Sequence, residues 1–404
     1  MYDVYKIRKD FPIFNEKINE HDNCFLDTAA SAQKPQRVLD KLISVYQSQY
    51  ANVHRGSYTL SENITAMYEA ARHTVQHFLN ASTAAEIVFT RNATESINLV
   101  AATWGRENLK KGDEVLISEA EHHANMVPWQ ALSEQLGFTL KYFALNNDGS
   151  FSEEAFLKQL SPKTKLVSFT AMSNVLGTVF PVKKIVTHAH EVGALAFVDA
   201  CQYIVHHHVD VHDWDCDFLA FSGHKTYGPS GIGVLYGKYD LLLQMPPYQY
   251  GGDMIRTVSF EESTFDAPPA RFEAGTPAIV QAIGLAEAID YMQEIGLKDI
   301  EHHERELTQY AIEKLNSIPG LKMLGTAPGK GGVFSFVLDD VHPDDTSFIL
   351  NKEGVSVRTG HHCAEPLVTK LGYPSVIRAS LGLYSTKEDI DQLVAALLKA
   401  KTFF

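Results

Sequence analysis

The sequence predicts an α/β protein whose central sheet is mostly parallel. Short apolar runs without polar alternation recur between residues 86 and 237, which is typical of strands buried on both faces. Helix-like stretches separate these runs, so βαβ units are expected. Beyond about residue 270 the alternation of strands and helices ends, and a long helical stretch precedes a few further strands. These observations predict a large α/β domain followed by a smaller α+β domain.

Six strands are expected in the large domain, each in a run rich in Val, Ile, Leu or Phe. They are EIVFT (86–90), DEVLIS (113–118), TKLVSFT (164–170), ALAFVDA (194–200), DFLAFSG (217–223) and IGVLYG (232–237). Ligands of open α/β sheets bind beyond the carboxyl ends of the strands, so the residues that follow these runs are the first candidates for a site.

The domain boundary is expected near RFEAGTP (271–277), before a long helical stretch at 278–316. Residues 21–273 then form the large domain and residues 274–404 the small one, and residues 1–20 are expected to pack on the small domain. Strands of the small domain are expected at 331–340, 354–360 and 376–384.

The last helix carries a clear start signal. Ser385 can cap it, with Glu388 completing a capping box. Its apolar stripe consists of Ile390, Leu393, Val394, Leu397 and Leu398.

Composition and charge exclude several classes of protein. The 404 residues are 45 % hydrophobic and 21 % charged, as in ordinary globular proteins. The net charge of −14 argues against nucleic acid or an anionic membrane as the main partner. No apolar run reaches the roughly 18 residues of a membrane span, and the N-terminus lacks the apolar core of a signal peptide.

The four cysteines, at positions 24, 201, 216 and 363, form no CxxC pair. A reducing cytoplasm is therefore expected rather than a disulfide framework, and a zinc site of the finger type is excluded.

Four chemically useful side chains follow the expected strands. Asp199 follows one strand, although an acid there is more simply interpreted as a helix N-cap. Lys225 follows another in SGHKTYGPSGIG; such a lysine is usually a surface charge, yet one desolvated at a strand end can bond covalently to a carbonyl carbon. Thr94 can cap a helix whose N-terminus would attract phosphate, or serve as a cap alone. His122 offers a flat ring, although paired histidines are more often structural.

Together these groups are what pyridoxal phosphate needs: an amine for its aldehyde, a carboxylate for its pyridine nitrogen, a ring to stack and a helix N-terminus for its phosphate. The turn GHKTYG lacks the spacing of a phosphate-binding loop, so nucleoside triphosphate binding is rejected.

Several motifs resemble those of the group II cysteine desulfurases, the SufS type. These are EHHANMVPWQ (121–130), SNVLGT (173–178), FSGHKTYGPSGIG (221–233), RFEAGTP and RTGHHCAEPL (358–367). The resemblance runs from DFPIF near the start to the final helix. It implies a fold-type I enzyme of the class V aminotransferase superfamily, with a seven-stranded-type sheet and pyridoxal phosphate as cofactor.

The resemblance also implies roles for individual residues. Lys225 would carry the cofactor, Asp199 would hold its ring nitrogen, Gln202 its phenolic oxygen, and His122 would stack on the ring and take part in catalysis. The phosphate would be held by Thr94, Ser222 and His224, and by Thr276 of the other subunit of a homodimer. Asn174 would lie near cofactor and substrate, Arg378 would bind the substrate carboxylate, and Cys363 would be the nucleophile.

The implied reaction converts L-cysteine to L-alanine, with the sulfur carried on Cys363 as a persulfide and passed to an acceptor of the SufE or SufU kind for iron–sulfur cluster assembly. Lyase activity on selenocysteine is compatible with the same residues. The motif NATES and Cys201 depart from the commoner form of the family.

Two alternatives compete with this interpretation. A plain aminotransferase would use Lys225, Asp199 and Arg378 but needs no thiol at Cys363. A metal site at His361, His362 and Cys363 is disfavoured because adjacent side chains of an extended segment point to opposite sides.

Overall fold

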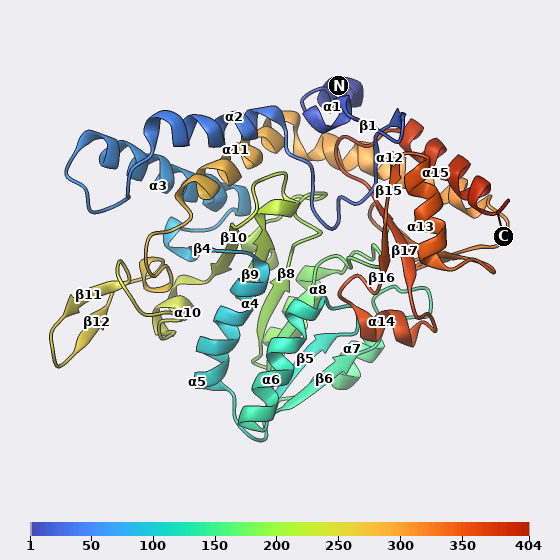
Figure 1. Cartoon of the computed structure of the whole chain (residues 1–404). Helices are drawn as coiled ribbons and strands as arrows, with labels where there is room; N and C mark the ends of the chain where they lie inside the picture. The colour runs from blue at the N-terminus through green and yellow to red at the C-terminus, as the bar shows by residue number, and fades with distance from the viewer. Residues whose placement is uncertain (1, 404) are drawn as a thin grey trace.

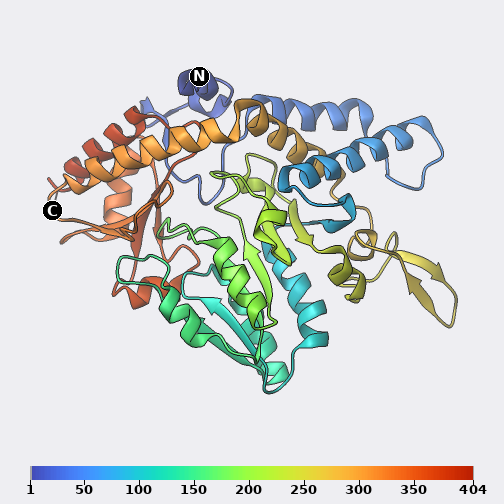
Figure 2. The same cartoon turned by 180° about the vertical axis from the view of Figure 1, so that it is seen from behind.

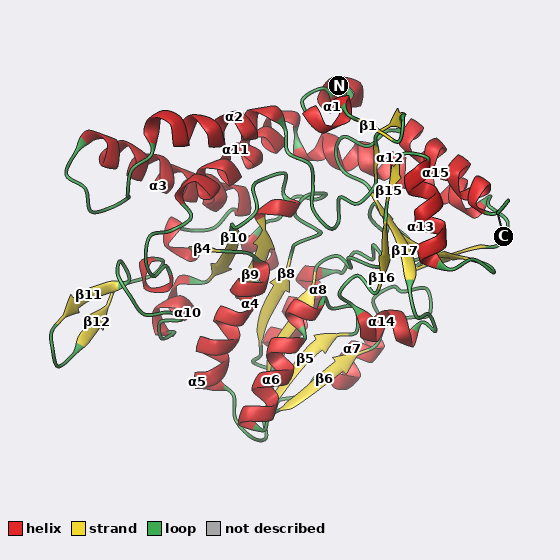
Figure 3. Ribbon diagram, in the orientation of Figure 1, coloured by secondary structure: helices red, strands yellow, loops and turns green. Residues whose placement is uncertain are grey.

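The computed structural model describes residues 2–403, which form two parts that lie side by side (Figure 1). A large sheet with helices on both faces forms one part, and a small antiparallel sheet with helices packed beside it forms the other (Figure 3). The helices are α1 Val4–Arg8, α2 Gln36–Ser44, α3 Thr59–Leu79, α4 Ala93–Val100, α5 Arg106–Asn108, α6 Val127–Leu136, α7 Glu153–Gln159, α8 Val182–Glu191, α9 Val211–Trp214, α10 Tyr239–Gln244, α11 Ile279–Ile295, α12 Leu297–Asn316, α13 Pro343–Lys352, α14 Glu365–Lys370 and α15 Lys387–Ala400.

The large sheet has seven strands in the order β4-β10-β9-β8-β7-β5-β6. Only β10 runs antiparallel to its neighbours. The predicted α/β class and mostly parallel sheet are therefore confirmed. The strands are β4 Ile87–Thr90, β5 Glu114–Ser118, β6 Thr139–Phe143, β7 Thr164–Thr170, β8 Leu195–Asp199, β9 Phe218–Ser222 and β10 Gly233–Gly237.

Both faces of the large sheet are buried. In β8, Ala196 and Val198 pack into the cluster that includes residues of α3, α8 and α11, whereas Phe197 packs into the opposite cluster with residues of α4 and α6. This double burial explains why the strands read as continuous apolar runs. Figure 2 shows α8 on the rear face, away from α4.

The small sheet is antiparallel, in the order β13-β14-β17-β16. Its strands are β13 Leu321–Leu324, β14 Val333–Leu338, β16 Arg358–Gly360 and β17 Val376–Ser380; α12, α13 and α15 pack together beside it. The short strands β3 Cys24–Phe25 and β15 Val355–Ser356 form a parallel pair at its edge. Two-stranded sheets join β1 Lys17–Ile18 to β2 His21–Asp22, and β11 Ile255–Val258 to β12 Ser263–Phe265.

Several sequence-based boundaries were wrong. The helical stretch expected at 278–316 is confirmed, and it consists of two helices because Gly296 takes φ +98 between α11 and α12. The expected strand 354–360 is split into β15 and β16, which pair with different partners. The helix α15 begins one residue late, because Thr386 caps it and Asp389 completes the capping box in place of Ser385 and Glu388.

The N-terminal segment contacts the C-terminal part of the chain. Arg8 pairs with Asp389 at 2.8 Å and donates to the carbonyl of Tyr384 at 3.0 Å. Tyr5 donates to the Glu388 carboxylate at 2.9 Å. The division between residues 273 and 274 stays a prediction.

Candidate active site

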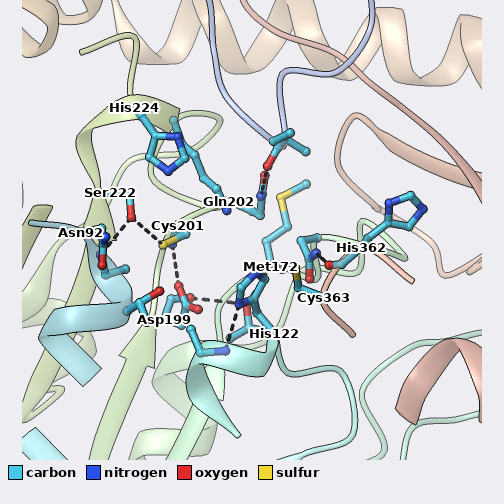
Figure 4. A pocket seen from close by; sticks show the side chains of 18 of the residues that line it. Asn92, His122, Met172, Asp199, Cys201, Gln202, Ser222, His224, His362 and Cys363 are labelled. Atoms are coloured by element: carbon cyan, nitrogen blue, oxygen red, sulfur yellow. Dashed lines mark hydrogen bonds between the residues drawn. The ribbon is translucent and has the colours of Figure 1, made fainter. Parts of the chain in front are cut away.

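A pocket of about 240 Å³ opens where the carboxyl ends of the large sheet's parallel strands face the small sheet. Side chains from both parts of the chain point into it (Figure 4). All of the predicted site residues except Thr276 line this pocket. It is the location that strand-end reasoning predicts for a ligand of an open α/β sheet.

The ends of β8 and β9 supply an acid and an amine. Asp199 closes β8, where its Oδ1 accepts from the amide of Cys201 at 3.0 Å. Turns follow rather than a helix, so Asp199 is not an N-cap. Lys225 ends a short 3-10 turn, Gly223–Lys225, directly after β9. A Cβ at Gly223 would lie 2.6 Å from a side-chain carbon of Ile232, so this sharp exit from the strand requires glycine.

The start of α4 forms another side of the pocket. Asn92, not Thr94, caps this helix: its Oδ1 accepts from the amide of Glu95 at 2.9 Å. Asparagine is among the best capping residues, so the expectation for Thr94 as the cap was wrong. Thr94 lies in the first turn, and its hydroxyl has no hydrogen-bond partner among residues 2–403. Ser222 accepts from the amide of Ala93 at 2.9 Å, which joins α4 to β9.

Two neutral imidazoles lie at the large-domain side. His122 lies in the turn after β5, where its Nδ1 accepts from the amide of Ala124 at 3.0 Å. Burial, and then the Lys225 ammonium, lower the pKa of His122 to about 4. Burial together with Lys225 and Lys34 lowers the pKa of His224 to about 4 as well. Both rings are therefore uncharged near neutral pH.

The polar residues beneath the pocket join it to the N-terminal segment. Gln202 donates from Nε2 to the carbonyl of Ala29 at 2.8 Å. The amide of Ala32 donates to the carbonyl of His224 at 3.0 Å. These bonds fix the turn that carries Lys225.

Arg378 in β17 supplies a buried cation from the small sheet. Its side chain is 2 % exposed, and it donates to the carbonyl of Asn174 at 3.0 Å and to Asp27 Oδ1 at 3.2 Å. Its Nε is buried without a partner among the described residues. Arg358 approaches the other oxygen of Asp27 at 3.4 Å. The Asp27 carboxylate thus faces two guanidinium groups. Because two positive charges face one negative charge, the site can bind a further anion.

Cys363 lies on the loop between β16 and α14. It is the exposed cysteine of the four, whereas Cys24, Cys201 and Cys216 are buried. His362 and Cys363 both adopt left-handed backbone conformations, with φ of +53 and +57. Each such residue costs about 1–2 kcal/mol, so the surrounding structure must hold this loop in place.

Asn174 connects the two parts of the pocket. Its Nδ2 donates to the carbonyl of His362 at 2.8 Å, and its own carbonyl accepts from Arg378. The His362 ring is buried, and both of its nitrogens lack partners among the described residues. Burial, with Arg378 and Arg358 nearby, lowers the pKa of His362 to about 3.

Thr276 is the one predicted site residue that lies elsewhere. It lines a separate pocket with Arg91, Tyr248 and Gln249, which adjoins α4 on its other side. Within the single chain it does not meet the residues expected to hold phosphate.

Asp27, Arg358 and Asn92 were missed from the sequence. Asp27 follows the apolar run CFL, so the strand-end rule could have found it. Arg358 lies within the RTGHHC motif itself. Asn92 precedes a helix, which is the position where its residue type is a known cap.

The residues present fit pyridoxal phosphate. The Lys225 amine and the Asp199 carboxylate line the same pocket. The Thr94 hydroxyl, free at the start of α4, can donate to a phosphate. The orphaned Nε of Arg378 suits the carboxylate of an amino acid. When bound, the cofactor would be held by Lys225, Asp199, His122 and the start of α4.

Among residues 2–403, no three His, Cys, Asp or Glu side chains gather as a metal site would require. No helix in that range combines the length and apolar character needed to cross a membrane.

Comparisons with known proteins agree on the family. The family "Aminotransferase class-V" matches residues 24–393. A cysteine desulfurase of Pectobacterium atrosepticum is 47 % identical over 98 % of this chain and 97 % of its own length. A cysteine desulfurase of Synechococcus elongatus is 47 % identical over 99 % of this chain, which spans 64 % of that protein.

Solved structures give the same result. The crystal structure of the cysteine desulfurase CsdA from Escherichia coli superposes with a TM-score of 0.92, at 36 % identity and with full coverage of both chains. The apo structure of the cysteine desulfurase from Thermococcus onnurineus gives 0.95 at 36 % identity, covering 100 % of this chain and 99 % of the other. The family uses pyridoxal phosphate, and this chain belongs to the class-V aminotransferases, among the cysteine desulfurases.

Proposed function

We propose that this chain is a group II, SufS-type cysteine desulfurase that moves the sulfur of L-cysteine onto Cys363 and passes it to an acceptor protein for iron–sulfur cluster assembly. One observation supports this most strongly. The exposed cysteine of the chain lines the same pocket as Lys225, Asp199 and Arg378. A plain aminotransferase has no use for a thiol there.

Arg378 binds the α-carboxylate of cysteine in this proposal. Its unpartnered Nε and its planar fork suit a carboxylate, and Arg358 adds a second positive charge beside it. Asp27 balances these two cations in the free enzyme. The amino group of the substrate then faces Lys225 across the pocket.

Lys225 would hold the cofactor through its amine, and the same amine would move the α-proton of the substrate. Pyridoxal phosphate, when bound, supplies a protonated ring that takes up the electron pair left at the α-carbon. Asp199 keeps the ring nitrogen protonated, and the neutral His122 stacks on the ring and exchanges protons near the substrate sulfur.

Cys363 attacks the substrate sulfur as a thiolate. A bond forms between its Sγ and the substrate sulfur while the bond from that sulfur to the β-carbon breaks. The electron pair stays with the β-carbon, which takes up a proton, and Lys225 returns a proton to the α-carbon, so alanine leaves and a persulfide remains on Cys363. The persulfide is then within reach of an acceptor, because Cys363 is exposed.

Several finer features belong to the same proposal. The short loop that carries Cys363 favours a dedicated SufE-like or SufU-like acceptor over many small partners. Three buried free cysteines suit a reducing cytoplasm. Thr276 would hold the phosphate of a partner subunit in a homodimer. Selenocysteine would enter by the same route, since selenium leaves carbon more readily than sulfur.

A cysteine pulse followed by mass spectrometry tests the role of Cys363. We expect stoichiometric alanine and one added sulfur on the peptide that contains Cys363. Cys363→Ser should bind the cofactor normally yet lose desulfuration of cysteine by about 10³-fold. Cys216→Ala, which changes a buried cysteine far from the pocket, is the control and should keep full activity. Full activity of Cys363→Ser would reject the proposal.

A further inference from the structure

The adjacent histidines of the EHH motif face different parts of the molecule. His122 lines the pocket, whereas His123 does not. His123 begins the 3-10 turn His123–Asn125 and lies against the loop that carries Cys363. Figure 4 shows His122 close to Cys363 at the border between the two parts of the chain. The proposed function gives His123 no role.

Two hydrogen bonds of His123 reach the backbone on either side of Ala364, the residue after Cys363. Its backbone amide donates to the carbonyl of Cys363 at 2.6 Å. Its Nε2 accepts from the backbone amide of Glu365 at 3.0 Å, two residues further along. One residue of the large domain thus holds the loop on both sides of Ala364. The Nε2 can accept this bond only without its proton, so the ring must be neutral with the proton on Nδ1.

The loop needs such support from outside. His362 and Cys363 are consecutive left-handed residues, a conformation that is costly for side chains other than glycine. Ala364 follows with a hydrogen bond to the carbonyl of His361, and α14 starts directly after it. The carbonyls of His362 and Cys363 instead accept from Asn174 and His123 of the large domain.

We propose that His123 is a positioning residue that clamps the Cys363 loop and thereby aims the Cys363 thiol at the substrate sulfur. The inference rests on the proposed role of Cys363 as the sulfur acceptor. His123 touches neither substrate nor cofactor in this arrangement. It acts through Glu365 and Cys363, whose backbone sets the direction of the Sγ atom.

A substitution at His123 can remove its side-chain hydrogen bond to Glu365 while its backbone hydrogen bond to Cys363 remains. In His123→Leu, nothing accepts from the Glu365 amide. In His123→Gln, the amide oxygen can accept in place of Nε2. The surface pair of Lys370 and Glu119, 2.5 Å apart, joins the same two segments and offers a matched control. The Lys370 side chain is exposed, so this ion pair contributes little to holding the two segments together, and Lys370→Ala should change little.

Hydrogen exchange of the pyridoxal phosphate enzyme without cysteine gives the direct measurement. Exchange in the peptide that spans 360–368 should speed up about 2- to 10-fold in His123→Leu, which corresponds to the loss of one hydrogen bond. His123→Gln and Lys370→Ala should match the wild type. Unaltered exchange in His123→Leu would overturn the clamp.

Kinetics of the same variants separate positioning from chemistry. His123→Leu should lower kcat by about 10- to 100-fold, as expected for a misplaced nucleophile, with little change in KM for cysteine. His123→Gln should restore most of kcat. A loss of kcat in both variants with normal exchange would make His123 a catalytic group and overturn the proposal.

The activity of Cys363→Ser and the exchange measurement distinguish a failure of the His123 clamp from a failure of the proposed function. Full activity of Cys363→Ser would reject Cys363 as the sulfur acceptor and, with it, the aiming role of His123. The exchange measurement depends on no turnover, so it reports on the clamp itself. Far-UV circular dichroism of each variant, unchanged from wild type, would show that the chain remains folded.

Discussion

The two sides of the pocket are built differently. On the large-domain side, Asp199, Ser222 and Gln202 are each engaged by hydrogen bonds within the chain. On the small-domain side, Arg378 and His362 keep buried nitrogens without partners among the described residues, and Cys363 has a left-handed backbone. In the proposed function, the large-domain side would hold the cofactor, and a substrate would supply the partners that the small-domain side lacks.

The largest effect is expected on the large-domain side, from Lys225→Ala. Without this amine the cofactor has no covalent attachment and the α-proton has no base, so turnover should fall by at least about 10²- to 10⁴-fold. The purified variant should also lose the visible absorbance of lysine-bound cofactor. Borohydride reduction and peptide mapping of the wild type provide the check, and a label on another lysine would contradict this assignment.

Arg378→Lys tests the small-domain side alone. The positive charge remains but the planar fork is lost, so KM for cysteine should rise by about 10-fold or more. Cofactor content should stay normal, because Arg378 lies on the opposite side of the pocket from Lys225. Absorbance and steady-state kinetics measured on the same sample decide the outcome. A loss of cofactor with unchanged KM would show that Arg378 holds the cofactor rather than the substrate.

Neutral histidines on both sides predict a dependence of stability on pH. The pKa of His122 and of His224 is about 4, and that of His362 about 3, against about 6.5 in unfolded chains. The unfolded chain therefore binds more protons as pH falls from about 6.5 to about 4. The free energy of unfolding should decrease over this window and stay level above it with respect to these groups.

Urea unfolding between pH 7 and pH 5 measures this dependence. His362→Asn should reduce the slope by up to about 1.4 kcal/mol per pH unit, the contribution of one proton. His73→Asn, at an exposed position of α3, is a control that should leave the slope nearly unchanged. Equal slopes for wild type and His362→Asn would show that His362 takes up its proton over the same pH range in the folded and unfolded chains, against a lowered pKa.

The smallest effect concerns the helix behind the small sheet. Thr386→Ala removes the cap of α15 and should lower the free energy of unfolding by about 1 kcal/mol. Ser385→Ala is the neighbouring comparison: the Ser385 hydroxyl accepts from the amide of Gly382 at 3.0 Å and does not cap the helix. Thermal unfolding of both variants ranks the two positions. Loss of catalysis in Thr386→Ala at normal stability would connect α15 to the site directly.

The sequence allowed the large-domain side to be predicted in more detail than the small-domain side. Apolar runs marked every strand of the large sheet except β6, whose exposed and half-buried residues at the sheet edge lack such a run. Asp199 and Lys225 could be found because Asp199 ends one buried strand and Lys225 follows another. The antiparallel direction of β10 depends on tertiary pairing that no local pattern records.

On the small-domain side, the cap of α15 and the position of Asp27 depend on contacts between segments that are distant in the sequence. Ser385–Glu388 and Thr386–Asp389 both match the pattern of a capping box. Asp389 pairs with Arg8 from the N-terminus, which is consistent with the observed choice. Asp27 faces Arg358 and Arg378 only because residues 24–25 pair with β15. Such pairings over more than 300 residues are not encoded in local periodicity.

The pairing of β3 with β15 also sets the order in which the enzyme can be completed during its synthesis. Residues 24–27 leave the ribosome more than 300 residues before Ser380, which bridges Asp27, and Arg8 leaves it long before its partner Asp389. Domains usually fold in order from the N-terminus as the chain grows. The strand β3 must therefore wait unpaired until residues 355–356 of β15 have been made. A growing chain can assemble all seven strands of the large sheet well before Asp27 is fixed beside Arg358 and Arg378.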